Sequence, residues 1–394
     1  YVMKDSYLTK GIRTTCASNV LKDFIAPYSA TVYEKLAHMT LVGKMNMDAW
    51  GHGGSSENTD FGPVKNPWDL SRVAGGSSGG PAAAVAARLV PFAIGEDTGG
   101  SIRNPANWCG ITGLKVTYGR VSRYGCIAYA SSFDTMGPMA KTAEDCAIIL
   151  GWIAGKDPYD ATTSSMPVSN YIEELKKDVK KIKIGVPKEL FGEGLDSEIR
   201  TAIEEAKKDL AKLGLEIIEI SMPMFHYGIM AYYIMAPSET SSNLARYDGL
   251  RYGCSRDNFT DETKRRIMIG TYALSAGYYD AYYKKAQQVR TLLIKEYEKA
   301  FMQCDAILMP VMPTSATKIG ELIEDPVKNM LADIYTVTQN TVGIPSLALP
   351  CGFTKSKLPI GMQLAGKMFS EDLLLRIGYH YQQITSWHKE KPEL

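Results

Sequence analysis

Apolar and polar residues recur along the chain with two spacings, one typical of helices and one of strands. Residues 197–213 carry apolar positions three and four apart, which predicts a helix with one buried face, and Gly214 follows as an end signal. Short apolar runs at 183–186 and 215–220 flank this helix, so we expect two strands joined by a helix. Similar runs predict further strands at 41–44, 90–94, 306–309 and 347–349.

Four other segments favour helices. The clearest is 141–153, where Thr142 and Asp145 have the spacing of an N-terminal capping box. The other three are 81–89, 272–302 and 372–385. Because strands and helices alternate along the chain, we expect an α/β fold in which a mixed central β-sheet is covered by helices on both faces.

Composition narrows the functional classes without choosing one. The chain has 44 basic and 43 acidic residues, a formal net charge of +1, and 45% hydrophobic residues. This argues against a disordered chain and against a dedicated nucleic-acid binder. The longest apolar runs, such as 82–87, are too short to span a bilayer. Seven scattered cysteines without a CxxC pair, and five histidines without metal-ligand spacing, predict neither a disulfide framework nor a metal site.

Two loops rich in glycine and serine are the densest chemical feature. Gly75–Gly80 has the sequence Gly-Gly-Ser-Ser-Gly-Gly, and Gly95–Ser101 has the sequence Gly-Glu-Asp-Thr-Gly-Gly-Ser. Glycine is retained where a chain turns tightly or approaches a ligand closely. Because the loops bracket a predicted helix and a predicted buried strand, both should lie near one edge of the sheet, where α/β folds bind ligands.

Three kinds of site are compatible with such loops. A phosphate-binding loop needs Lys followed by Ser or Thr after the glycines, and both loops lack that pair. Gly75–Gly79 matches the G-x-S-x-G elbow of hydrolases, but residues 66–72 before it are not an apolar strand, and no histidine stands in a recognisable acid–base context. The third possibility is a serine nucleophile that a lysine activates in place of histidine.

Longer motifs distributed over the chain indicate a known family. They are Thr9–Cys16, Gly53–Phe61, Gly75–Gly80, Asp97–Arg103, Tyr118–Tyr124, Thr240–Gly249 and Gly270–Tyr283. With these motifs the chain resembles the amidase signature family and, within it, the A subunits of tRNA-dependent amidotransferases. The resemblance implies one amidase signature domain over residues 1–394, with a helical part that would normally precede residue 1.

The resemblance also implies a Ser–cis-Ser–Lys triad. By motif position the nucleophile is Ser101, the bridging serine is Ser77 after a cis Gly76–Ser77 peptide, and the base is Lys4. Each role makes chemical sense, because a serine hydroxyl needs a base and a lysine is a base only as the neutral amine that burial favours. The backbone N–H groups that would bind the substrate oxyanion belong to Thr98, Gly99 and Gly100.

The same resemblance implies a glutaminase that holds glutamine with Tyr232, Arg266 and Asp333. Arginine can fork onto an α-carboxylate, and aspartate can accept from an α-ammonium group. A partner, the amidotransferase B subunit, would use the ammonia, with ATP and Mg, to amidate Glu-tRNA(Gln) or Asp-tRNA(Asn), and would supply most of the tRNA contacts. A small C subunit would bridge the two. We expect no cofactor or metal in this chain and a location in a bacterial cytoplasm or an organellar matrix.

Two other functional hypotheses stay open at this point. A stand-alone amidase that cleaves other small amides would share the triad but would not need Arg266 and Asp333. A non-enzymatic scaffold is disfavoured, because all three triad positions carry the residues that the chemistry needs.

Overall fold

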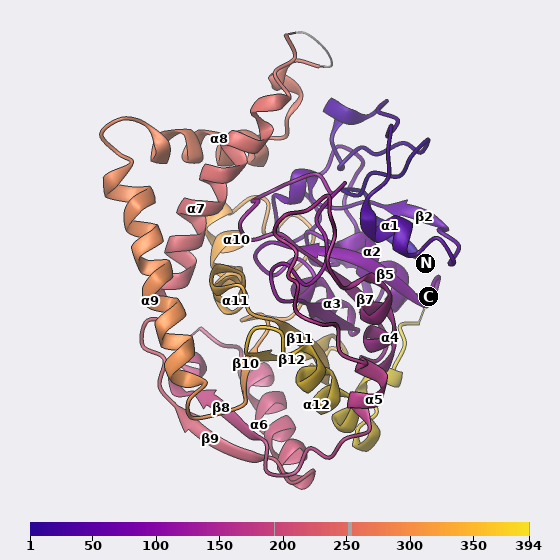
Figure 1. Ribbon diagram of the computed structural model, residues 1–394, viewed down its shortest axis with the longest axis vertical. Coiled ribbons are helices and arrows are strands. Elements are labelled where there is room, and N and C mark those ends of the chain that lie inside the picture. The colour runs from indigo at the N-terminus through magenta and orange to yellow at the C-terminus, as the bar shows by residue number, and fades with distance from the viewer. Residues whose placement is uncertain (193, 251–253, 394) are drawn as a thin grey trace.

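A large mixed β-sheet forms the centre of the molecule (Figure 1). The computed structural model describes residues 1–192, 194–250 and 254–393, and in these residues the sheet has ten strands. In spatial order they are β2 (Gly43–Met45), β1 (Val2–Lys4), β5 (Phe92–Asp97), β7 (Thr135–Ala140), β6 (Thr112–Lys115), β11 (Ser346–Phe353), β12 (Pro359–Gly366), β10 (Ala306–Pro310), β8 (Lys183–Pro187) and β9 (Glu216–Ile220).

Strand directions change across the sheet, which confirms the mixed architecture. β1 is parallel to both of its neighbours, β2 and β5. At the opposite edge β8 is parallel to β9 and β10. Antiparallel pairs join the strands between these two groups. A separate short hairpin consists of β3 (Lys65–Asn66) and β4 (Asp69–Val73).

Helices cover both faces of the sheet, as predicted. Successive residues of a strand point to opposite faces, and in β5 Ala93 packs in one hydrophobic cluster while Phe92 and Ile94 pack in another. The Ala93 cluster contains α2 (Gly79–Ala86) and α3 (Arg103–Cys109). The helices on the other side are α4 (Ala143–Ile153), α5 (Tyr171–Leu175), α6 (Ser197–Lys212) and α12 (Glu371–Ile384).

Local sequence patterns predicted several of these elements well. Thr142 caps α4, and its hydroxyl accepts the Asp145 N–H at 3.0 Å. The α6 helix starts at the predicted residue and is followed by Gly214 with φ +87°. Parallel β8 and β9 complete the expected strand–helix–strand unit. The helix predicted at 81–89 instead begins two residues earlier, inside the first glycine loop.

The single long helix predicted over 272–302 is wrong. The chain forms α8 (Asp261–Leu274), turns, passes through a π-helical turn at Asp280–Lys284 and continues as α9 (Lys285–Ala300). Gly277 has φ +88° in the turn, a backbone conformation that ends a right-handed helix. Two helices therefore replace one, and α9 packs against α7 (Tyr227–Asn243) (Figure 1).

Three further short helices lie in the described residues. They are α1 (Thr31–Lys35), α10 (Pro326–Ala332) and α11 (Val337–Val342). No helix in the described part of the chain is long and apolar enough to cross a bilayer.

Candidate active site

The two glycine-rich loops lie against each other at the end of β5. The Ser78 N–H donates to the Ser101 carbonyl at 3.2 Å, and the Ser78 hydroxyl donates to the Glu96 carbonyl at 3.1 Å. The Gly76–Ser77 peptide is cis, as the family resemblance implied. A Cβ on Gly76 would lie 2.0 Å from Asp48 Oδ2, so only glycine fits there. The loops thus meet at one edge of the sheet, as predicted.

Lys4 reaches this loop pair from the end of β1. Parallel pairing with β5 brings the lysine alongside the second glycine loop. Its Nζ donates to Ser77 Oγ at 2.7 Å and to the Glu96 carbonyl at 3.3 Å, and lies 3.4 Å from Glu96 Oε2. Lys4 and Ser77 are each 1% exposed, whereas Ser101 is 8% exposed. Of the three predicted triad residues, Ser101 is therefore the one that a substrate can reach most easily.

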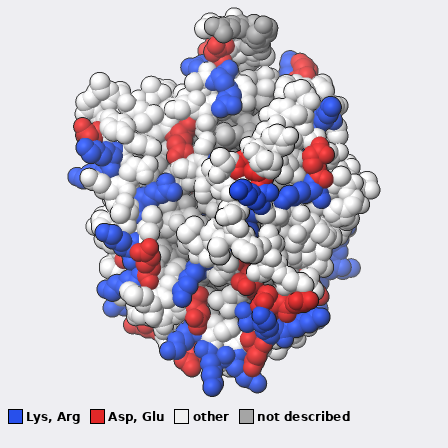
Figure 2. Space-filling model, in the orientation of Figure 1, with Lys and Arg blue, Asp and Glu red and all other residues white. Residues whose placement is uncertain are grey.

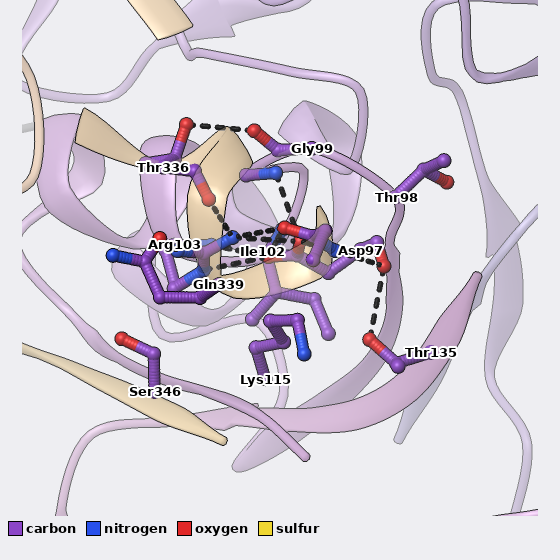
Figure 3. A network of polar contacts seen from close by, with 12 residues as sticks. Asp97, Thr98, Gly99, Ile102, Arg103, Lys115, Thr135, Thr336, Gln339 and Ser346 are labelled. Carbon is purple, nitrogen blue, oxygen red and sulfur yellow. Dashed lines mark hydrogen bonds and ion pairs between the residues drawn. The ribbon is translucent and has the colours of Figure 1, made fainter. Parts of the chain in front are cut away.

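Asp97, the last residue of β5, organises the backbone around Ser101 (Figure 3). Its carboxylate accepts the Gly100 N–H at 2.8 Å and the Ile102 N–H at 3.0 Å. Arg103 donates to both carboxylate oxygens, from Nε at 3.1 Å and from Nη2 at 3.0 Å. Because these bonds bracket the serine in sequence, they fix its backbone from both sides.

Arg103 in turn ties the loop to segments far away in sequence. It is fully buried, and its guanidinium donates to acceptors on Thr336, Gln339, Asn340 and Gln363. Burial alone would raise the pKa of the Asp97 carboxyl, but the Arg103 guanidinium holds it below its ordinary value. A buried, fully bonded ion pair therefore positions the candidate nucleophile.

The loop segment before Ser101 has two backbone N–H groups without an acceptor in the described residues, those of Thr98 and Gly99. The Gly100 N–H is engaged by Asp97. The Gly99 carbonyl accepts from the Thr336 hydroxyl at 2.6 Å, which fixes the orientation of the segment. Free donors in a rigid loop are what an oxyanion site requires.

Tyr232, Arg266 and Asp333 come together beside this loop. A Cβ on Gly99 would lie 2.5 Å from the Tyr232 hydroxyl, so the tyrosine packs directly against the loop. The Tyr232 hydroxyl donates to that of Tyr129 at 3.5 Å, and Arg266 Nη1 donates to the same Tyr129 oxygen at 2.5 Å. Three residues that are distant in sequence and predicted to bind substrate thus share one cluster.

Aromatic and acidic neighbours hold the charged members of this cluster. The Arg266 guanidinium donates from Nε to Glu262 at 2.7 Å and lies over the Tyr233 ring, 5.4 Å from its centroid. The Tyr233 hydroxyl donates to Asp333 Oδ2 at 2.6 Å. Burial raises the pKa of the Asp333 carboxyl to about 6. Arg266 Nη2 makes no hydrogen bond with the described residues and is free to bind an anionic group.

A cavity of about 270 Å³ lies beside the cluster. Its lining includes Asp48 and Ser55 near the first glycine loop, Glu262 next to Arg266, and Asn329. In the described part of the chain no group of three or more His, Cys, Asp or Glu residues has the arrangement of a metal site.

Sequence reasoning did not identify Tyr129, Tyr233 or Glu262. Glu262 stands four residues before Arg266 on a helix, and that spacing is a usable signal for an ion pair. Tyr233 is adjacent to Tyr232, which was predicted to bind substrate. Because adjacent residues of a helix point in different directions, this adjacency did not predict that Tyr233 belongs to the site. Nothing local marks Tyr129, which lies in a loop before β7.

Comparisons with known proteins identify the family of the chain. The family model described as Amidase matches residues 1–375. The A subunit of glutamyl-tRNA(Gln) amidotransferase from Coxiella burnetii is 55% identical over 408 residues, which cover 99% of this chain and 84% of the relative. Its counterpart of the same name from Trichormus variabilis is 53% identical over 412 residues, covering 100% and 85%. The crystal structure of the A subunit of glutamyl-tRNA(Gln) amidotransferase from Thermotoga maritima is 42% identical with a TM-score of 0.87, covering 98% and 82%.

Proposed function

This chain belongs to the amidase family, and we propose that it is a glutaminase, which hydrolyses the side-chain amide of glutamine and releases ammonia. The observation that carries the proposal is the 2.7 Å hydrogen bond from Lys4 to the cis-linked Ser77, in a loop that is itself bonded to the Ser101 segment. The relatives that are A subunits of glutamyl-tRNA(Gln) amidotransferase, at 55% and 53% identity, support an amide-donating role.

In the proposed mechanism Ser101 attacks the glutamine amide carbon. Its proton passes to Ser77 as the Ser77 proton passes to the neutral amine of Lys4, because a hydroxyl can donate and accept at once. The exposed fractions favour this order, since Ser101 is 8% exposed and the two relay residues are 1% exposed. The leaving ammonia then takes the proton back, and water releases glutamate from Ser101.

The Thr98 and Gly99 N–H groups would stabilise the oxyanion that forms in this attack. They belong to a loop that Asp97 and Thr336 hold in place, so little reorganisation is needed. The third predicted donor, Gly100, already donates to Asp97 and would contribute by fixing the loop.

Glutamine recognition is assigned to the cluster formed by Tyr232, Arg266 and Asp333. Arg266 Nη2 would bind the α-carboxylate, and the Asp333 carboxylate would accept from the α-ammonium group. The Tyr232 hydroxyl, which packs against Gly99, would position the substrate between the loop and the charged residues. This arrangement selects a zwitterionic amino acid with a side-chain amide.

The names of the relatives imply a multi-subunit enzyme. We propose that B and C subunits join this chain in a glutamyl-tRNA(Gln)/aspartyl-tRNA(Asn) amidotransferase. The B subunit would bind the misacylated tRNA and use ATP and Mg. On the face shown in Figure 2, basic and acidic side chains are interspersed, which suits a protein that leaves tRNA to its partner. The bacterial relatives support a cytoplasmic location.

Ammonia release from glutamine tests the proposal. Ser101→Ala in the complete protein is expected to abolish it. Ser238→Ala is the matched control, because Ser238 is a buried serine whose hydroxyl donates to the Ile234 carbonyl on α7. Undiminished release by Ser101→Ala would show that another residue is the nucleophile.

A further inference from the structure

Glu96 is a buried carboxylate that the triad does not use. It lies in β5, one residue before Asp97, and is 1% exposed. Its Oε2 is 3.4 Å from Lys4 Nζ, while its Oε1 is buried and has no hydrogen-bond partner in the described residues. Lys4 therefore has three acceptors around its amine: the Ser77 hydroxyl, the Glu96 carbonyl and the Glu96 carboxylate.

Apart from Lys4, the groups around Glu96 do little to stabilise a negative charge on its carboxylate. The titratable groups that face it from neighbouring segments are Tyr7, Cys16, Cys126 and Asp134. Burial raises the pKa of each of these groups, and the Glu96 carboxylate raises it further. Neutral or acidic neighbours do not stabilise an anion, so Lys4 is the cation on which a charged Glu96 depends in the described residues.

We propose that Glu96 accepts a proton from Lys4 and thereby leaves Lys4 as the neutral amine that the hydrolysis needs. In this step one Nζ–H bond of the Lys4 ammonium breaks, an O–H bond forms on the Glu96 carboxylate, and both charges disappear. The amine then takes the Ser77 proton as Ser77 takes that of Ser101. The inference rests on the proposed glutaminase function, and Glu96 is a positioning residue because it acts through Lys4.

Desolvation is the physical reason for this transfer. Two ions that are almost completely buried lose most of their hydration, and their mutual attraction repays the loss only when the geometry is excellent and every remaining polar atom is bonded. Here the ion contact is 3.4 Å long and one carboxylate oxygen has no partner in the described residues. A neutral amine beside a neutral carboxyl group avoids the cost of removing two ions from water.

Glu96→Gln separates proton acceptance from hydrogen bonding. The amide can still accept from Lys4 but cannot take its proton, so near neutral pH we expect kcat for glutamine hydrolysis to fall by about 10²-fold. KM for glutamine should not change, because Glu96 does not contact Tyr232, Arg266 or Asp333. The deficit should shrink in alkaline buffer, where hydroxide removes the lysine proton instead.

Glu371→Gln is the matched control. Glu371 is also fully buried, lies 3.8 Å from a cation, Arg120, and has one oxygen without a partner in the described residues, but it stands at the start of α12. Its replacement should leave the pH profile of kcat unchanged. Glu96→Asp keeps a carboxyl group, so this variant should retain the shape of the wild-type profile even if kcat is lower.

The pH profile decides the outcome. A loss of kcat in Glu96→Gln that is the same at every pH would mean that Glu96 only holds Lys4 in place. A kcat higher than that of wild type near neutral pH would mean that the charge of Glu96 makes Lys4 a poorer base. Either result overturns the inference, as would an alkaline-shifted profile in Glu96→Asp. If wild type releases ammonia from glutamine and Ser101→Ala does not, only this inference fails. Undiminished release by Ser101→Ala would show instead that another residue is the nucleophile, and absence of release by wild type would refute the glutaminase proposal itself.

Discussion

Replacing Asp97 with alanine should both destabilise the protein and stop glutamine hydrolysis. The change leaves the fully buried Arg103 guanidinium without its ion-pair partner and frees the Gly100 and Ile102 N–H groups. Breaking a buried ion pair by removing one partner costs about 3–5 kcal/mol. With an unfolding entropy of about 2.1 cal/mol/K per residue, a chain of this length should lose roughly 4–6 °C in Tm.

Thermal unfolding followed by circular dichroism measures this loss. Asp209→Ala is the control, because Asp209 forms a comparable 2.7 Å ion pair with Lys212 whose lysine side chain is 70% exposed. A surface pair of this kind contributes about 0–1 kcal/mol, so its removal should move Tm by no more than about 1 °C. Equal Tm losses in the two variants would refute the view that the buried Asp97–Arg103 pair holds the nucleophile loop.

The effect of Asp97 on stability has a defined pH dependence. Its pKa in the folded protein lies below the value in the unfolded chain, because Arg103 outweighs the opposing effect of burial. The stabilisation is therefore fully present above the unfolded pKa, about 3.9 for aspartate, and is lost as the pH falls through the lower folded value. The Tm difference between wild type and Asp97→Ala should thus narrow only in strongly acidic buffer.

The remaining predictions concern substrate binding and the oxyanion loop. Arg266→Ala should raise KM for glutamine by about 10²-fold, since loss of a buried charge pair costs roughly 2–5 kcal/mol. Arg265→Ala is the control and should leave KM unchanged, because the Arg265 side chain is partly exposed. Unchanged glutamine kinetics in Arg266→Ala would favour an amidase for other amides. KM in wild type should rise as the pH falls below about 6, because the Asp333 carboxylate then becomes protonated, and steady-state assays of Asp333→Asn should show a high KM without this rise. Gly99→Ala should lower kcat/KM by about 10²–10³-fold, because the new methyl group meets the Tyr232 hydroxyl and displaces the loop.

Local sequence signals predicted the regular elements but not the change of direction after α8. The Thr142 cap and the apolar face of residues 197–213 are properties of neighbouring residues, and both helices formed as expected. The segment after Tyr272 keeps a helical pattern and contains no proline, so it resembled one helix. The turn depends on Gly277 and on the packing of Tyr272 against Tyr278, with ring centroids 4.3 Å apart, and the pattern does not encode that packing.

The candidate site, like the fold, was only partly predictable from local sequence. The two glycine loops are visible in the sequence, but nothing near Lys4 marks it as a site residue, and only the family resemblance selected it. Its contact with Ser77 requires β1 to pair in parallel with β5, about ninety residues away along the chain by the pairing of Val2 with Ala93.

Covalent labelling of Ser101 tests the central claim most directly. A glutamine-like electrophile, incubated with the complete protein and mapped by peptide mass spectrometry, should form one adduct on Ser101. The adduct should be absent in Ser101→Ala and should form far more slowly in Lys4→Ala, because the base that activates the serine is gone. An adduct on Ser78, or none in the wild-type protein, would contradict the account.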